Sequence, residues 1–246
     1  MVLLYGSNGQ GKTNILEALY MLAVVKSPRA SSDRELVRHE ALNQGEHSQI
    51  SAIVQRDGEP IRVIIGMQAT APTSMADDAA HITGSPDATP PSSTVQKQIR
   101  VNGAPRRTST LVGEVNAVLF TAQDLDMVFG PPSFRRRYLD ILISQIDNQY
   151  LRAIQEYRRV MTQRNHLLKT VRGGRSETAE LEFWEDELVK SGKYIMLKRA
   201  ETVATLARIC TPLHEKLSHG SERLQVIYRP SIEFEVGELH LERVMR

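Results

Sequence analysis

The chain has 246 residues, 41% of them hydrophobic and 24% charged, which is the balance of a soluble globular protein with one large or two small domains. Its single cysteine, Cys210, excludes an internal disulfide framework. We find no secretion signal and no apolar run near the roughly 20 residues of a membrane span, so we expect a cytoplasmic protein. The net charge is only +2, but residues 100–175 carry 13 Lys and Arg against 6 Asp and Glu. This region predicts either an anionic partner, such as nucleic acid, or a solvated basic surface.

A phosphate-binding loop is predicted close to Met1. The sequence GSNGQGKT, from Gly6 to Thr13, fits the pattern G-x-x-x-x-G-K-[ST]. The apolar run Val2–Tyr5 predicts a buried parallel strand before it, and apolar spacings of three and four after Thr13 predict a helix. Strand, glycine-rich loop and helix form the context that a nucleotide-binding P-loop requires.

The residue types of this loop fit the chemistry of a nucleoside triphosphate. Glycines let the backbone approach an anion and direct its N–H groups toward it, and the start of the helix adds the positive end of its dipole. We expect Lys12 to bind the β and γ phosphates of ATP and the Thr13 hydroxyl to coordinate Mg²⁺. The predicted nucleotide-binding residues of the loop are Gly6, Ser7, Asn8, Gly9, Gln10, Gly11, Lys12 and Thr13.

Short strands are expected to follow, at residues 49–56, 61–65, 95–101 and 115–120. The first two form a hairpin around Asp57-Gly58, with Glu59-Pro60 lengthening its loop, and Asn102-Gly103 signals another hairpin turn. Residues 69–94 are rich in Ala, Thr, Ser, Pro and Asp and are expected to form a disordered inserted loop.

The rest of the chain has a mainly helical pattern. Asp147 is predicted to cap a long helix that Gly173-Gly174 ends, and a second long amphipathic helix follows, so that the two form an antiparallel arm. A returning strand is expected at 223–229 and a further helix from residue 238. The predicted domains are an N-terminal lobe of the head at 1–130, a helical arm at 131–222 and a return to the head at 223–246.

Nucleotide binding does not by itself predict hydrolysis. Phosphoryl transfer also needs a carboxylate, usually after an apolar strand, to hold the metal and orient water. Asp77-Asp78 lies in the loop 69–94, and Val118–Phe120 leads only to Thr-Ala-Gln-Asp. We therefore do not expect this chain to hydrolyse ATP alone.

Three consecutive arginines, Arg135–Arg137, occur in the stretch GPPSFRRRYLD. On a helix they point about 100° apart and cannot share one partner. Together with Arg106 and Arg107 they are candidates to contact DNA phosphates or another protomer. They could instead join a structural ion-pair network with Asp140 or Asp126, and the sequence leaves both interpretations open.

The stretch AQDLDMVFGPPSFRRRYLD, residues 122–140, resembles the signature of the RecF family of bacterial recombination mediators. The matching residues are Gly130, Pro132, Arg135, Arg136, Tyr138, Leu139 and Asp140. Ala122 and Gln123 replace the usual proline and acid. The stretches VNGAPRR, GQGKTNILEALY and QRNHLLK are also similar to the family, so the resemblance covers nearly the whole chain outside 69–94.

The resemblance implies an α/β fold, in which a P-loop NTPase head of the ABC type, with a mixed sheet, carries an inserted antiparallel helical arm. It implies ATP and Mg²⁺ as cofactors and places Gln123 in the Q-loop region that senses the γ-phosphate and the metal. It further implies an ATP-dependent homodimer that binds gapped DNA or junctions of single and double strands with little sequence preference. Such a protein works in the bacterial cytoplasm, at the nucleoid, with RecO and RecR to help load RecA.

The family pattern continues beyond both ends of the sequence, into strands before Met1 and into a signature motif and an acidic pair after Arg246. The chain is therefore expected to be part of a longer gene product. One alternative is an SMC-like chromosome ATPase head, which predicts a far longer coiled coil. Another is a small-molecule kinase or a transporter ATPase, whose lid or Leu-Ser-Gly-Gly-Gln motif we do not find. A third is an inactive fragment that binds partners through the arm.

Overall fold

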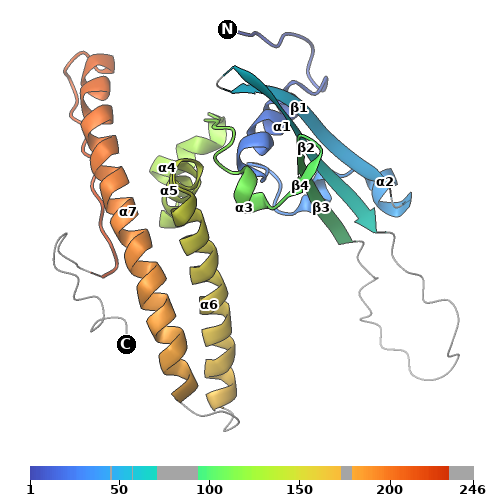
Figure 1. The fold of residues 1–246 in the computed structure, drawn as a ribbon. Helices are drawn as coiled ribbons and strands as arrows, with labels where there is room; N and C mark the ends of the chain where they lie inside the picture. The colour runs from blue at the N-terminus through green and yellow to red at the C-terminus, as the bar shows by residue number, and fades with distance from the viewer. Residues whose placement is uncertain (45, 57, 71–93, 173–178, 233–246) are drawn as a thin grey trace, which may run out of the picture. The chain divides into compact units, whose positions relative to one another are not determined.

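The computed structural model describes residues 1–44, 46–56, 58–70, 94–172 and 179–232. The chain forms two compact units, Met1–Phe120 and Thr121–Arg246 (Figure 1), and each has its own hydrophobic cluster. The division falls at Phe120 because the short helices η2 (Ala122–Leu125) and α4 (Asp126–Phe129) contact each other and α4 contacts α5 (Pro132–Ile146). The predicted division into three domains, with boundaries after residues 130 and 222, stays a prediction.

The first unit combines an antiparallel sheet with short helices. Its strands pair in the order β1-β2-β3-β4, each with its neighbour in sequence. The strands are β1 (His47–Arg56), β2 (Glu59–Thr70), β3 (Thr94–Val101) and β4 (Ala104–Arg106). The helices are α1 (Lys12–Val24), η1 (Asp33–Leu36), α2 (His39–Gln44) and α3 (Thr108–Leu111).

Of the two predicted hairpin turns, one is confirmed and the predicted length of the other is wrong. Asn102 (φ 50°) and Gly103 (φ 83°) both adopt positive φ, as a two-residue type I′ turn requires, and this turn is confirmed. The longer loop expected at Glu59-Pro60 is wrong, because Glu59 already pairs with Arg56. Pro60 is tolerated in β2 because β3 pairs with β2 only from Val63 onward, so no second strand needs an N–H from Pro60.

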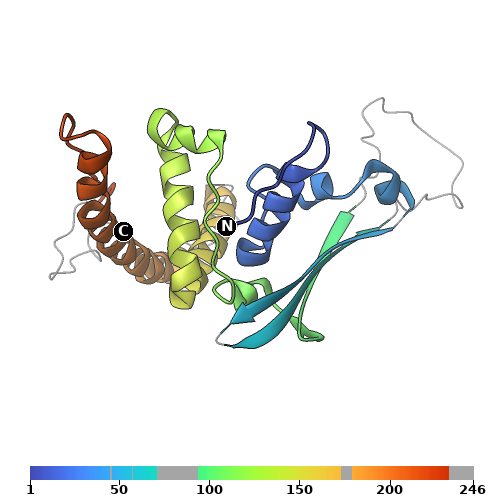
Figure 2. The ribbon, with the colours of Figure 1, turned by 90° about the horizontal axis from the view of Figure 1, so that it is seen from above.

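One face of the sheet carries the core of the first unit. Val63, Ile65, Met67 and Ala69 alternate along β2 and are all buried. Met67 and Ala69 share a cluster with residues of α1, α2 and the segment between them: Met21, Val37, Ala41 and Leu42. Figure 2 shows α1 and α2 on the same side of the curved sheet. This packing fixes the C-terminal half of α1, whose first turn forms the candidate site.

Two strands predicted from apolar runs are not formed in the described residues. Val2–Tyr5 is exposed and has no strand partner. In the run 115–120 only an isolated bridge joins Val112 to Val115, and Val118 and Phe120 are 87% and 81% exposed. An apolar run becomes a strand only where a neighbouring strand accepts its backbone hydrogen bonds, and none of the described strands lies beside either run.

The second unit is built on two long helices, α6 (Asn148–Arg172) and α7 (Ala179–Leu217). They run antiparallel side by side (Figure 1), since Arg164 near the end of α6 pairs with Glu185 near the start of α7 at 2.8 Å. Ile154 and Tyr150 of α6, Ile195 of α7 and Ile143 of α5 form the core. None of the described helices is long and apolar enough to cross a membrane.

The strand expected at 223–229 is wrong, because no sheet exists in the described part of this unit to pair with it. The segment instead lies against α7, where the Thr211 hydroxyl donates to the Leu224 carbonyl at 3.1 Å. Three further expectations lie outside the described residues. They are the body of the loop 69–94, the break at Gly173-Gly174 and the helix from residue 238.

The predicted helix cap at Asp147 is confirmed. Its Oδ1 accepts hydrogen bonds from the backbone N–H groups of Gln149 and Tyr150, at 2.9 and 3.0 Å. The Tyr194 hydroxyl of α7 donates to Oδ2 at 2.9 Å. Burial pushes the pKa of Asp147 upward, but these hydrogen bonds and nearby Lys198 outweigh burial and hold the pKa below its ordinary value.

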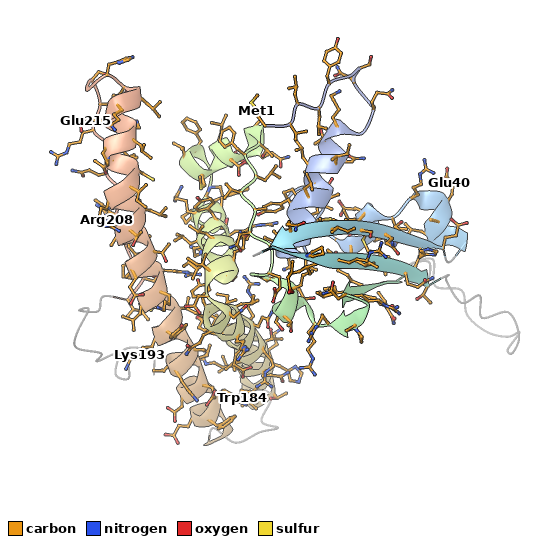
Figure 3. All side chains as sticks on the ribbon, turned by 45° about the horizontal axis from the view of Figure 1, so that its top comes forward. Met1, Glu40, Trp184, Lys193, Arg208 and Glu215 are labelled. Carbon is orange, nitrogen blue, oxygen red and sulfur yellow. The ribbon has the colours of Figure 1, made fainter. Side chains whose placement is uncertain are left out.

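This cap predicts an acid-dependent contribution to stability. A carboxylate with a lowered pKa stabilises the fold above its unfolded-state pKa, and this stabilisation is lost as the pH falls through the folded-state value. Asp147→Ala should therefore lower the free energy of unfolding by about 1 kcal/mol at neutral pH, and the difference from wild type should narrow below about pH 4. Urea unfolding at both pH values measures this. The control is Glu215→Ala, which removes an exposed carboxylate from α7 (Figure 3). If the difference in unfolding free energy between Asp147→Ala and wild type were the same at both pH values, the cap would not be the source of the acid dependence.

Candidate nucleotide-binding site

The predicted phosphate loop leads directly into α1. Gly9 (φ 81°) and Gly11 (φ 82°) adopt left-handed backbone conformations that side chains disfavour. A Cβ atom at either position would meet no atom within 4 Å, so the requirement for glycine comes from the backbone angles and not from crowding. Gly11 is the N-cap residue of α1, and its carbonyl accepts the first helical hydrogen bond, from Ile15 N–H at 3.1 Å.

The Lys12 side chain folds back over this loop. Its Nζ donates to the carbonyl oxygens of Gly6 and Ser7, both at 2.7 Å. An ammonium group has three protons, so this arrangement leaves one N–H free for an anion. The two carbonyl contacts hold the positive charge at the loop, where a phosphate group would bind.

The start of α1 is suited to an anion. No side chain caps it, and its first turn contains no acidic residue. The backbone N–H groups of the first turn and the helix dipole therefore remain available for phosphate oxygens. Ser7, Asn8 and Gln10 line the same exposed loop. These features fit a triphosphate bound by residues 6–13.

Thr13 is the residue of this loop that can hold a metal ion. It is the second residue of α1 and its side chain is exposed. No group of three or more His, Cys, Asp or Glu that could bind a metal occurs in the part of the chain that the structure describes. The Thr13 hydroxyl and the oxygens of the nucleotide itself are oxygen ligands of the kind that Mg²⁺ prefers.

Gln123, the second predicted metal and nucleotide contact, lies in η2 of the other unit. Its neighbour Asp124 closes a capping box, since the N–H and hydroxyl of Thr121 donate to Asp124 Oδ2 at 2.5 and 2.9 Å. Gln123 is exposed, and its backbone carbonyl accepts a hydrogen bond from the Asp126 N–H. Its role at the nucleotide stays a prediction.

The arginines proposed for DNA binding or an interface occupy different structural positions. Arg106 ends β4 and Arg107 precedes α3, and both are exposed in the first unit. In the second unit, Arg135 Nη1 donates to the carbonyls of Met127 and Gly130, both at 3.1 Å, which ties the start of α5 to the end of α4. Arg136 and Arg137 are exposed on α5.

The sequence suggested an ion-pair network between the arginine run and Asp140, and the structure gives Asp140 partners on α6 and α7. Arg199 of α7 donates from Nη2 to Asp140 Oδ1 at 2.6 Å, and Arg158 of α6 lies 3.4 Å from Oδ2. The Tyr150 hydroxyl donates to the same Oδ1 at 2.6 Å and accepts from Arg199 Nε at 3.0 Å. We call Asp140, Tyr150 and Arg199 the arm triad.

The arm triad is a structural brace between three helices. Tyr150 is fully buried, and the side chains of Asp140 and Arg199 are only 13% and 15% exposed. Burial is the largest cause that raises the pKa of Tyr150, and the Asp140 carboxylate raises this pKa further. The Tyr150 hydroxyl therefore remains a hydrogen-bond donor. Sequence reasoning missed Arg199 because it lies 59 residues from Asp140 and no local pattern marks it.

Comparison with known proteins relates this site to one family, although no protein-family model matches the chain. The chain is 39% identical over 236 residues to the DNA replication and repair protein RecF of Chloroflexus aurantiacus, covering 93% of this chain and 57% of that relative. It is 33% identical over 228 residues to RecF of Bacillus cytotoxicus, covering 93% and 53%. The chain thus spans somewhat more than half the length of these curated relatives.

Solved structures agree with the sequence comparison. A structure described as the recombination mediator protein RecF-ATP in the RecFOR pathway matches with a TM-score of 0.78 and 27% identity, over 98% of this chain and 57% of that one. A second, described as RecF-ATPrS, matches with a TM-score of 0.75. The expected fold class, an α/β ATPase head with a helical arm, is confirmed, but the four-stranded sheet of the described residues is antiparallel and not mixed.

Proposed function

The chain belongs to the RecF family, and on this premise we propose that it carries the nucleotide-binding and arm regions of a recombination mediator that binds DNA in an ATP-dependent way during DNA repair and replication. The single observation that supports the proposal most is the structure of the loop Gly6–Thr13. Its glycines adopt left-handed backbone conformations, the helix that follows has no side-chain cap, and the Lys12 side chain lies over the loop. The relative described as RecF-ATP supports ATP as the ligand.

The loop residues have defined tasks in this proposal. The N–H groups of residues 6–13 bind phosphate oxygens, and Lys12 neutralises charge on the β and γ phosphates. The Thr13 hydroxyl would hold Mg²⁺, and Gln123 stays a predicted contact to the metal and the γ-phosphate. The bound triphosphate supplies the negative charge and the cleavable bond. The chain itself would bind and orient the nucleotide.

We further propose that the protein binds gapped DNA or junctions of single and double strands with little sequence preference. Arg106, Arg107, Arg136 and Arg137 are exposed and could supply charge for phosphate contacts, as could Arg135, which also donates to two backbone carbonyls. In the longer protein, nucleotide binding would favour a homodimer closed on DNA, assisted by RecO-like and RecR-like partners that help load RecA. We place this activity in the bacterial cytoplasm, at the nucleoid.

Equilibrium DNA binding tests the proposal. Fluorescence anisotropy of a labelled gapped duplex would be measured with the chain alone, with ATP and Mg²⁺, and with ADP and Mg²⁺. We expect ATP to tighten binding by at least roughly fivefold, a coupling of about 1 kcal/mol. Equal affinities in all three conditions would exclude an ATP-dependent switch in this chain.

A further inference from the structure

Charge is unevenly divided between the two long helices of the second unit. The sequence of α6 contains six Lys and Arg and only one acidic residue, Glu156. The first twelve residues of α7 contain five Asp and Glu and one Lys. Basic charge is therefore concentrated on one helix of the pair, whereas the facing end of the other helix is acidic.

Three of the six Lys and Arg of α6 lie on the face opposite its core contacts, whereas Arg158 and Arg164 pair with Asp140 and Glu185. At about 100° per residue, Arg152, Arg159 and His166 fall in one narrow sector because they are seven residues apart. Between residues 152 and 169 the exposed residues of this sector, which we call the α6 basic stripe, are Arg152, Gln155, Arg159, Thr162, Gln163, His166 and Lys169. The buried residues Ile154, Val160 and Leu167 lie on the other side of the helix. The stripe is about 26 Å long at about 1.5 Å per residue.

Most of the positive charge on the stripe is available to a ligand. The side chains of Arg152 and Lys169, at its two ends, make no ion pair or hydrogen bond with the described residues. Arg159 pairs with Glu156 across an exposed contact, with side chains 62% and 38% exposed, which is a weak interaction in water. No acidic residue belongs to the stripe itself.

The composition of the stripe favours nucleic acid over a protein partner. A stable protein interface has an apolar or aromatic centre that is buried on binding. The stripe has no apolar residue, and Arg, Lys and Gln are side chains that donate to phosphate oxygens. One strand of a duplex advances about 3.4 Å per phosphate, so a stripe of this length can lie along several consecutive phosphates.

We propose that the α6 basic stripe binds the sugar–phosphate backbone of DNA, as a contact surface additional to Arg106, Arg107 and the arginine run. The inference rests on the proposed DNA-binding function and adds the arm helix to it. The stripe contacts no base edges, so it contributes affinity and orientation without sequence preference.

Matched charge changes test this assignment. The double variant Arg152→Gln/Lys169→Gln removes the two unpaired charges of the stripe. The control, Arg208→Gln/Lys216→Gln, removes two exposed charges from α7 (Figure 3 labels Arg208). DNA affinity would be measured on a gapped duplex between about 50 and about 200 mM salt. We expect the stripe variant to bind roughly tenfold more weakly, and its slope of log affinity against log salt to become shallower by about 2.

The outcomes separate this inference from the proposed function. If binding depends on ATP but the stripe variant and the control have the same salt slope, the inference is wrong and the function stands. If the stripe variant loses affinity although ATP has no effect, the stripe binds DNA and the ATP-dependent function is wrong. If the wild-type chain binds no DNA, both are wrong. If polyglutamate of equal charge competes as strongly as DNA, the stripe is a general polyanion surface and the assignment to nucleic acid is overturned.

Discussion

Replacing Lys12 by alanine is expected to weaken ATP binding by at least roughly thirtyfold, which corresponds to about 2 kcal/mol, while the fold stays intact. The ammonium group is the only cation of the loop 6–13, and a hydrogen bond to a charged group is worth about 1.5–3 kcal/mol. Its contacts in the structure are two carbonyls of the same exposed loop, so folding loses little when they are removed. Titration with a fluorescent ATP analogue measures the change.

Two further variants make this result interpretable. Lys190→Ala removes an equal charge from an exposed side chain of α7, 79% accessible, and should leave ATP affinity unchanged. Thr13→Ala should reduce affinity in the presence of Mg²⁺ and have little effect when EDTA is added, because the hydroxyl acts through the metal. If Lys12→Ala bound ATP as tightly as the wild-type chain, the assignment of this loop as the nucleotide-binding site would be wrong. A large fall in its melting temperature would show that Lys12 is structural.

Features encoded within a few residues could be predicted from the sequence. The turn Asn102-Gly103 follows from two residues that tolerate positive φ, and the cap at Asp147 follows from a carboxylate before a helical pattern. The glycine-rich loop and the start of α1 belong to the same class, because backbone angles and a helix terminus decide them locally. Each signal and the structure it specifies lie in the same short segment.

Features that depend on a distant partner could not be predicted. The apolar runs Val2–Tyr5 and 115–120 signal burial, but a strand also needs a neighbour, and the described sheet ends without reaching either run. The wrong prediction of a loop at Pro60 has the same reason. Pro60 is tolerated in β2 only because β3 begins to pair with β2 farther along that strand, at Val63. The sequence identifies the apolar residues, but it does not identify the elements that will pack beside them.

The arginine-rich signature shows the same limit at the candidate surfaces. Its spacing indicated three diverging side chains, and the structure gives Arg135 a local role that the spacing did not indicate, as a donor to the carbonyls of Met127 and Gly130. Asp140 takes its partners from α6 and α7 because helix packing, and not chain proximity, brings those cations close. The signature therefore combines exposed cations with residues that hold the unit together.

Replacing Asp140 by asparagine is expected to destabilise the helical unit by about 3 kcal/mol, although the change is nearly isosteric. The substitution leaves Arg199, only 15% exposed, without its carboxylate, and an unpaired buried charge costs more than a lost exposed pair. The only tryptophan of the chain, Trp184, lies in α7, so its fluorescence in urea follows the unfolding of this unit. Glu156→Gln, which breaks the exposed pair with Arg159, should cost only about 0.5 kcal/mol.

A double-mutant cycle separates the charge pair from its surroundings. If Asp140 and Arg199 depend on each other, Arg199→Met should recover part of the loss in Asp140→Asn, because it removes the charge that the first change leaves unpaired. Additive losses would show that Asp140 acts mainly through Tyr150 and Arg158. A stable Asp140→Asn variant with weakened DNA binding would contradict the structural role altogether. Since Asp140 is partly buried and faces three donors inside the unit, we expect stability to respond first, and DNA binding only through loss of the folded arm.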